Sequence, residues 1–170
     1  LKKIKKFNIQ KKFYKYDLTN FNNCLKISKD QDIIFHLADV VAGINFVFDN
    51  EPYVFNQNIL MNTNILKASI INNVKKFIYV GTACSYPEFL QSKITKKPFK
   101  EEDAYPAQPE SSYGWSKLMG EYECLLAQKN KLINVAILRL HNIYGTPTTL
   151  NPKFSQVIPA LCRKVILDQK

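Results

Sequence analysis

The stretch Lys76-Phe77-Ile78-Tyr79-Val80 has the composition of a short buried β-strand, which Gly81 ends, and Thr82 lies just beyond it. Apolar runs of similar length occur at residues 32–38 and 134–140. Amphipathic segments long enough for helices separate these runs, from about residue 54 to 73 and from about 112 to 130. This alternation predicts an α/β fold, a doubly wound parallel sheet covered by helices on both faces.

The remaining segments give further expectations about secondary structure. Residues 13–16 are expected to form a short strand, and residues 87–111, which contain four prolines, a long ordered loop. The helix at 112–130 has an apolar stripe that we expect to pack on the sheet. That stripe consists of Leu118, Tyr122, Leu125 and Leu126. A last helical stripe begins at Val157 and is expected to run to the C-terminus.

The composition is that of a globular domain. The chain has 170 residues, 46% of them hydrophobic, which fits one domain or a piece of a larger protein. The net charge of +10 comes almost entirely from lysine, since Arg139 and Arg163 are the only arginines. Nucleic-acid surfaces usually contain arginine as well. The lysines are scattered apart from a run in residues 2–12, so we favour a compositional bias over nucleic-acid binding.

The cysteines and apolar runs bear on metal binding and location. The four cysteines are far apart in the sequence and only two histidines accompany them, so no zinc-type spacing exists and no metal site is predicted. No apolar run reaches the roughly 18 residues of a membrane span, and residues 1–12 lack the apolar core of a signal peptide. We therefore expect a cytoplasmic protein with reduced thiols.

A glycine-rich phosphate-binding turn is absent from the sequence. A doubly wound nucleotide-binding fold begins with a strand, a glycine-rich turn and a helix whose N-terminus receives the pyrophosphate. This chain has only five glycines and contains neither GxGxxG nor a Walker A sequence. Either the chain binds no dinucleotide, or the unit that would bind it lies outside this sequence.

Tyr113 and Lys117 are the first candidates for chemistry. They stand four residues apart in the predicted helix at 112–130, so their side chains share one face. A nearby ammonium favours phenolate and lowers a tyrosine pKa, which makes the tyrosine a usable general base. In a chain this rich in both residue types such a pair also arises by chance, as a surface lysine beside a core tyrosine. Thr82 adds weight, because it follows a strand at the carboxyl edge where α/β sheets bind ligands.

At this point the sequence resembles the extended short-chain dehydrogenase/reductase family, the NAD(P)-dependent nucleotide-sugar epimerases, dehydratases and reductases. Order and spacing of several motifs carry the resemblance over nearly the whole chain. These motifs are Phe35-His36-Leu37-Ala38, Gly81-Thr82-Ala83-Cys84-Ser85-Tyr86-Pro87, Ser112-Tyr113-Gly114-Trp115-Ser116-Lys117, Arg139-Leu140-His141-Asn142-Ile143-Tyr144-Gly145 and Val157-Ile158-Pro159-Ala160-Leu161-Cys162-Arg163-Lys164. The fold class implied is an incomplete Rossmann-like doubly wound parallel sheet. The GDP-mannose 3,5-epimerase and GDP-fucose synthase branches are most similar.

The resemblance implies a catalytic role for four residues. Tyr113, aided by Lys117 and Thr82, would take the proton of the sugar 4-hydroxyl while hydride passes to NAD or NADP. The resulting 4-ketone acidifies the protons at C3 and C5, and Cys84 would remove one of them as thiolate. The alternative for Cys84 is a buried free thiol, the commonest state of cysteine.

The resemblance also implies binding residues. Cofactor contacts beyond Tyr113 and Lys117 would come from Asp17, Leu18, Leu37, Ala38, Leu140 and Ile143. Substrate contacts beyond Cys84 would come from Gly43, Asn142, Gln156, Val157, Arg163 and Lys164. Simpler structural roles stay open for some: Asp17 as a cap before Thr19, Asn142 as a turn residue, and the two cations as partners of a helix dipole. For His36, inside a strand, we favour a hydrogen-bonded core residue.

Three departures from the family pattern stand out. Gln156 occupies the position of a lysine or histidine proton donor, and glutamine cannot shuttle a proton. Ala38-Asp39 replaces an Ala-Ala pair, and Ala42 replaces the first glycine of a Gly-Gly pair. The N-terminal glycine-rich unit and most of the C-terminal domain are missing. We therefore expect a fragment or truncated product, with a partial dinucleotide-binding domain at 1–145 and the start of a substrate-binding domain at 146–170.

The function predicted from these features is an NAD(P)-dependent nucleotide-sugar epimerase or reductase that acts through a transient 4-keto sugar. The complete enzyme is expected to be a homodimer. A sugar-nucleotide 4-epimerase is the alternative enzyme, because it needs only Thr82, Tyr113 and Lys117. A truncated, inactive binding module is the alternative from a different class.

Overall fold

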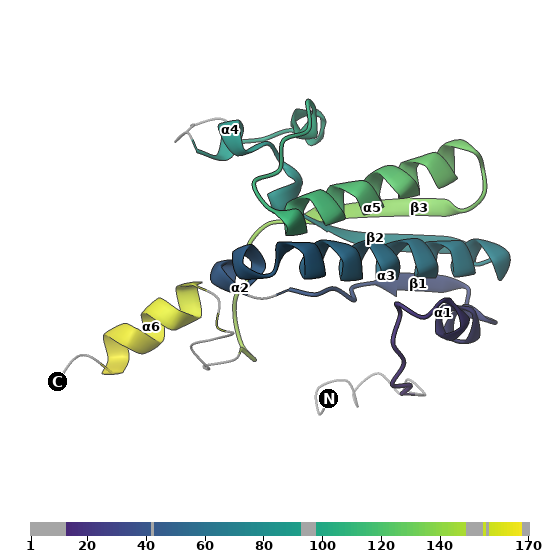
Figure 1. The fold of residues 1–170 in the computed structure, drawn as a ribbon, viewed down its shortest axis with the longest axis horizontal. Helices are drawn as coiled ribbons and strands as arrows, with labels where there is room; N and C mark the ends of the chain where they lie inside the picture. Colours follow the sequence, from purple (N-terminus) through teal and green to yellow (C-terminus); the bar gives the residue numbers. More distant parts are fainter. Residues whose placement is uncertain (1–12, 42, 93–97, 149–154, 156, 168–170) are drawn as a thin grey trace.

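A three-stranded parallel sheet forms the centre of the molecule (Figure 1). The computed structural model describes residues 13–41, 43–92, 98–148, 155 and 157–167. The strands are β1 (Ile33–His36), β2 (Lys76–Thr82) and β3 (Asn134–Leu140), in the order β1-β2-β3. In the register Thr82 pairs with Leu140, so β2 and β3 end side by side. The predicted α/β fold with parallel strands is confirmed.

The main helices are α1 (Phe21–Ser28), α2 (Ile44–Asp49), α3 (Glu51–Ile71), α5 (Ser112–Lys129) and α6 (Val157–Leu167). Helices α2, α3 and α5 lie between the strands in the sequence, α1 precedes β1, and α6 follows β3. The segment predicted as a long loop contains the short helix α4 (Glu88–Gln91) and the 3₁₀ turn η3 (Glu101–Ala104), and the turn η2 (Ala83–Ser85) follows β2. Helices α3 and α5 lie side by side along the sheet (Figure 1). Ser111 starts α5, because its hydroxyl accepts a hydrogen bond from the Gly114 amide at 3.2 Å.

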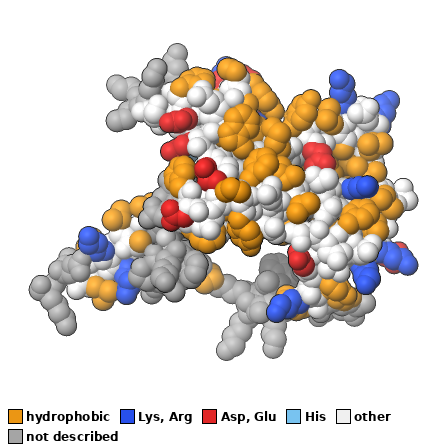
Figure 2. Space-filling model, viewed as in Figure 1, with side chains coloured by type: hydrophobic (Ala, Val, Ile, Leu, Met, Phe, Trp, Pro, Cys, Tyr) orange, Lys and Arg blue, Asp and Glu red, His pale blue; other side chains and the backbone are white. Residues whose placement is uncertain are grey.

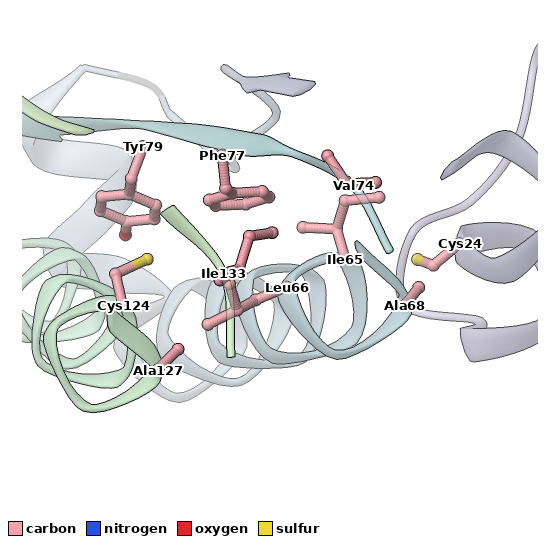
Figure 3. Close-up of a cluster of buried hydrophobic side chains, with 10 residues drawn as sticks. All are labelled: Cys24, Ile65, Leu66, Ala68, Val74, Phe77, Tyr79, Cys124, Ala127 and Ile133. Atoms are coloured by element: carbon pink, nitrogen blue, oxygen red, sulfur yellow. The ribbon is translucent and has the colours of Figure 1, made fainter. Parts of the chain in front are cut away.

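The hydrophobic core lies between β2 and the two long helices. Successive side chains of a strand point to opposite faces, so Phe77 and Tyr79 share one face of β2, and both are fully buried. Figure 3 shows both rings directed at the helices, where Ile65 of α3 and Cys124 of α5 meet them. The core therefore fixes how α5 lies on the strand that ends at Thr82.

The opposite face of the sheet differs from the prediction. In the described part of the chain, Ile33, Phe35 and Leu138 on that face are 51%, 63% and 45% exposed. The helices that pack on the sheet within these residues cover the other face. The apolar runs led us to predict helices on both faces of the sheet. The runs do supply apolar side chains to both faces, although the helices among the described residues cover one face.

The buried face of α5 also differs from the prediction. Of the predicted stripe only Leu118 is buried, whereas Tyr122, Leu125 and Leu126 are 42–51% exposed. The buried positions include Gly114, Lys117, Gly120, Glu121 and Cys124. A Cβ at Gly120 would collide with the Tyr79 hydroxyl, so the helix backbone lies directly on this ring. Small residues allow that close approach. Lys117 and Glu121 are buried because each has an ionic partner.

The predicted strand at 13–16 is wrong. Residues 13–16 form no strand, and Phe13 is 89% exposed. A strand needs a neighbouring strand to satisfy its backbone groups, and none pairs with this segment in the described part of the chain. Helix α1, which the sequence analysis did not predict, begins soon afterwards, capped by the Asn20 side chain.

Candidate functional site

A cavity of about 420 Å³ opens at the carboxyl edge of the sheet. The segment after β1, the ends of β2 and β3, and the first turn of α5 line it. Six of the predicted site residues are among its lining: Thr82, Cys84, Tyr113, Leu140, Asn142 and Ile143. Parallel strands place their carboxyl ends at one edge, which is why residues far apart in the sequence meet here.

Thr82 and Cys84 form one side of the cavity. The Thr82 hydroxyl accepts a hydrogen bond from the Cys84 amide at 3.2 Å, which fixes the turn after β2. The Cys84 side chain is exposed, so the alternative of a buried free thiol does not hold for it. Gly114 lets α5 approach this turn, because a Cβ there would collide with the Cys84 carbonyl oxygen and lie 2.9 Å from Cβ of Pro109.

Tyr113 lines the same cavity as Thr82, and hydrogen bonding to Thr82 lowers the pKa of Tyr113. The net shift is nevertheless upward. Burial raises the pKa of Tyr113 most, and the nearby Asp39 carboxylate and Cys84 raise it further. Lys117 is not among the groups that cause this shift.

The physical reason is the ionic partner of Lys117. Its ammonium lies 3.0 Å from Oδ2 of Asp39, and the two side chains are only 2% and 8% exposed. The same ammonium sits over the Tyr79 ring, 4.6 Å from the ring centre. Burial raises the pKa of Asp39, and the charge of Lys117 offsets part of that shift. The sequence showed Asp39 only as a departure from the family pattern and gave no sign that it meets Lys117.

A second buried ion pair supports the turn that carries Cys84. Nε of Arg139 donates to Oε2 of Glu121 at 2.8 Å, and the Glu121 side chain is 1% exposed. The guanidinium also donates to the Glu101 carbonyl and lies 5.3 Å from the centre of the Tyr86 ring. Arg139 thus ties β3 and α5 to the segments on either side of residues 93–97. The sequence analysis missed Glu121, because a glutamate in a helix is usually solvated.

The other predicted binding residues that the structure describes are not among those that line the cavity. Asp17 accepts hydrogen bonds from the Thr19 amide at 2.9 Å and the Thr19 hydroxyl at 2.8 Å, which lower its pKa, and Leu18 packs against the core. These contacts make a local Asx turn at Asp17, and the cap of α1 is Asn20 and not Asp17.

The remaining predicted binding residues in the described part of the chain follow β1 or lie on α6. Leu37 is exposed and Ala38 half-buried after β1, while Gly43 is the residue before α2. On α6 the side chains of Val157, Arg163 and Lys164 are exposed. Gln156 lies outside the described residues.

His36 is part of the core, as predicted. It is 3% exposed, and its Nε2 lies 2.7 Å from Oδ1 of Asn62. Burial lowers the pKa of His36 to about 4. The ring is thus neutral near pH 7 and donates to the amide oxygen.

The described residues form neither a cluster of metal ligands nor a membrane-spanning helix. No three His, Cys, Asp or Glu side chains in them are grouped so that they could hold a metal ion. None of the helices in the same residues has both the length and the apolar character needed to span a membrane.

Comparison with known proteins agrees with this geometry. The chain is 38% identical over 152 residues to GDP-mannose 3,5-epimerase of Arabidopsis thaliana, which covers 89% of this chain and 40% of the plant enzyme. It is 29% identical over 156 residues to GDP-L-fucose synthase of Sinorhizobium fredii, which covers 88% of this chain and 48% of that enzyme.

Solved structures give the same result. GDP-mannoheptose C4 reductase from Campylobacter jejuni with NADP bound has a TM-score of 0.80 and 28% identity, over 97% of this chain and 49% of the reductase. The chain thus spans less than half the length of these three proteins. Residues 2–170 match the NAD dependent epimerase/dehydratase family, and with this match the chain belongs to that family.

Proposed function

We propose that this chain supplies the catalytic edge of an NAD(P)-dependent nucleotide-sugar epimerase or reductase that acts through a transient 4-keto sugar. The observation that carries the proposal is the meeting of Thr82, Cys84 and Tyr113 in one cavity at the carboxyl edge of the sheet. GDP-sugars are the favoured substrate class, because the curated relatives named above act on them.

The cofactor proposed is NAD or NADP. The lining of the cavity fits the nicotinamide end of such a molecule, because it combines Tyr113 with the apolar side chains of Leu140 and Ile143, at and beyond the end of β3. A nicotinamide held by these residues would supply the hydride acceptor and donor for C4 of the sugar. Asp17, Leu18, Leu37 and Ala38 remain proposed contacts for the rest of the cofactor.

The residues of the chain would handle the protons. Tyr113, as phenolate, accepts the proton of the 4-hydroxyl while C4 becomes a ketone, and the Thr82 hydroxyl orients that oxygen. The ketone acidifies the neighbouring C3 and C5 protons. Cys84 is exposed at the cavity and, as thiolate, removes one of them. Asn142 lines the same cavity and is the proposed hydrogen-bond partner of a sugar hydroxyl.

The test uses the longest natural form of the protein that contains this chain, with NAD(P) and GDP-mannose in deuterated water. Epimerisation through C3 or C5 incorporates deuterium at those carbons, which mass spectrometry and NMR detect. Cys84→Ser should reduce the exchange by about 100-fold or more while hydride transfer at C4 persists. Inversion at C4 of another sugar nucleotide without C3 or C5 exchange would instead identify a 4-epimerase.

The division into domains is also a proposal. We place the end of the nucleotide-binding part at residue 145 and the start of a substrate-binding part at 146–170, with Gly43, Gln156, Arg163 and Lys164 as contacts to the substrate. The exposure of α6 supports this division. Val157, Leu161 and Val165 are 65%, 56% and 59% exposed, and the buried residue of α6 is Pro159. An apolar helix of this kind normally packs against further protein.

A homodimer in the cytoplasm is the proposed state of the complete enzyme. Support comes from an apolar stripe on α5 formed by Trp115, Met119, Tyr122 and Leu126, which we call the α5 stripe. Its members are 36–51% exposed and follow one face at i, i+4, i+7 and i+11. Figure 2 shows hydrophobic side chains gathered over α5 and α3. The four cysteines are free thiols, which suits a reducing compartment.

A further inference from the structure

His141 lines the cavity but has no role in the reaction proposed above. We propose that His141 is a second acid–base group of the epimerisation. After Cys84 removes a proton from C3 or C5 of the 4-keto sugar, the His141 imidazolium delivers a proton to the same carbon from the opposite face. This inference rests on the proposed function in one respect, the removal of a proton by Cys84.

Inversion at a carbon atom needs two proton carriers. A single thiol that removes a proton and gives it back acts on one face of the sugar, so it restores the original configuration. Delivery to the other face needs a second group that holds a transferable proton. A site that inverts C3 or C5 therefore contains an acid besides Cys84.

Four of the described residues that line the cavity have titratable side chains: Cys84, Glu110, Tyr113 and His141. Cys84 and Tyr113 already have proposed roles. Of the other two, His141 has the side-chain type that most readily gives up and regains a proton near neutral pH, which suits a group that is recharged in every cycle. Its side chain is exposed, so solvent reaches it for that purpose.

The ends of two neighbouring strands bring His141 and Cys84 to the same place. Thr82 pairs with Leu140 in the register of β2 and β3, and neighbouring strands lie about 4.8 Å apart. His141 directly follows this pair on one strand, and Cys84 comes two residues after it on the other. Both residues line one cavity of about 420 Å³. We therefore expect a sugar ring in this cavity to lie within reach of both groups.

Tyr86 orients the imidazole relative to the turn that carries Cys84. The His141 and Tyr86 rings are stacked, with centres 6.5 Å apart and planes inclined by 24°. Tyr86 ends the turn η2, where its amide donates to the Ala83 carbonyl at 3.1 Å, and it is 4% exposed. The Arg139 guanidinium lies 5.3 Å from the centre of the same ring. One buried tyrosine thus contacts the imidazole and belongs to the turn of the thiol.

The protons and electrons of this step balance. Cys84 enters as thiolate and takes a proton from carbon, which leaves the electron pair of that bond in the enolate of the 4-keto sugar. His141 enters as imidazolium, and its proton forms the new C–H bond as the enolate returns to the ketone. Cys84 is then a thiol and His141 a neutral imidazole. Solvent takes a proton from the thiol and gives one to the imidazole.

The test is the variant His141→Gln in the longest natural form of the protein, with NAD(P) and GDP-mannose in deuterated water. Glutamine is polar but holds no transferable proton. Cys84 should still return deuterium from its own face, so the recovered substrate should contain deuterium at C3 or C5 with its configuration unchanged. The inverted product should fall by about 100-fold or more. NMR of the recovered sugars measures both quantities.

Two further variants separate catalysis from structure. His141→Phe keeps an aromatic ring for the stack on Tyr86 but has no proton to give, so it should lose the inverted product as His141→Gln does. Glu110→Gln changes the other titratable side chain of the lining and is the matched control, which should keep the inverted product.

Three results would overturn the proposal. They are an inverted product that persists in His141→Gln, an inversion restored in His141→Phe, and an equal loss of exchange and inversion in His141→Gln, which indicates a displaced Cys84. Failure of the proposed function gives a different result, because the unmodified protein then introduces no deuterium at C3 or C5.

Discussion

Helix α5 contributes two charged side chains to the interior of the protein. Lys117 and Glu121 are 2% and 1% exposed, and each is paired with a residue from another element, Asp39 and Arg139. Desolvation makes a single buried charge expensive, while a paired charge is tolerated. The effect of changing one of these residues therefore depends on what remains of its pair.

Lys117→Met should lower the free energy of unfolding by about 3–5 kcal/mol, because the Asp39 carboxylate is left buried without its cation. Adding Asp39→Asn should restore most of that loss. Chemical denaturation of the two variants and the unmodified chain measures both quantities. A double variant as unstable as Lys117→Met would show that packing of the lysine, and not its charge, is what matters.

Tyr113→Phe should abolish turnover, by a factor of about 100 or more, because no phenolate remains to accept the sugar proton. The phenyl ring fills nearly the same space, so the fold and cofactor affinity should persist. Turnover is measured with the natural full-length protein, and cofactor binding by the rise in melting temperature with excess NADP. Near-normal turnover would remove Tyr113 from the mechanism.

His36 should make stability depend on pH. Its pKa is 6.5 unfolded and about 4 folded, so below pH 6.5 the unfolded chain binds a proton that the folded chain does not. The free energy of unfolding should therefore fall by up to about 3 kcal/mol between pH 7 and pH 4. His36→Gln should flatten this slope, whereas His141→Gln, at the exposed histidine, should keep it. Denaturation at several pH values gives the slopes, and equal slopes in both variants would contradict the assignment.

At the scale of elements, the contact between α5 and the turn η2 builds the site. Gly114 stands where the helix meets the Cys84 carbonyl, and Ser111 caps the helix one turn earlier. Thr82 ends β2 and accepts a hydrogen bond from the Cys84 amide. The position of the thiol relative to Tyr113 thus depends on how closely a helix approaches a strand end.

Gly114→Ala should destabilise the protein and displace Cys84. Glycine to alanine inside a helix normally stabilises by about 1 kcal/mol, so a loss here reverses the usual sign. The cause is the collision of the new Cβ with the Cys84 carbonyl oxygen. Ser112→Ala is the control, since it alters the same turn but removes a buried hydroxyl that has no partner. Denaturation measures the loss of stability, and the rate of Cys84 alkylation reports the displacement of Cys84. A Gly114→Ala variant that is more stable than the unmodified protein would show that α5 does not approach the Cys84 carbonyl this closely.

At the scale of the whole molecule, apolar surface remains on two sides of the described residues. One is the sheet face with Phe35 and Leu138, and the other is the α5 stripe. Apolar patches of this kind usually mark contacts with further protein. A two-fold axis brings the same patch of both copies together, which suits a stripe along one helix.

The double variant Tyr122→Lys/Met119→Lys should dissociate the proposed dimer. It removes apolar contact across the two-fold axis and brings like charges together there. Leu125→Lys, on α5 beside the stripe and 45% exposed, is the matched control and should matter less. Sedimentation velocity of the natural full-length protein gives the oligomeric state. A dimer that persists in the double variant would place the interface elsewhere.

Part of the fold and the site was predictable from local patterns. The three strands and the long helices follow from apolar periodicity, and the strand ends then bring Thr82, Tyr113 and Leu140 to one edge. The orientation of α5 was not predictable in the same way. Its buried face contains Lys117 and Glu121, which a periodicity analysis assigns to solvent, while its leucines at 125 and 126 are exposed.

By itself the sequence determined the α/β alternation, the order of the motifs and the shared helix face of Tyr113 and Lys117. The tertiary structure alone decided which charge Lys117 meets. Asp39 lies 78 residues earlier in the chain and reaches the lysine only because β1 pairs with β2 and α5 packs against β2. Whether a charged side chain is solvated or buried depends on the elements around it, and those contacts between distant residues leave no local pattern in the sequence.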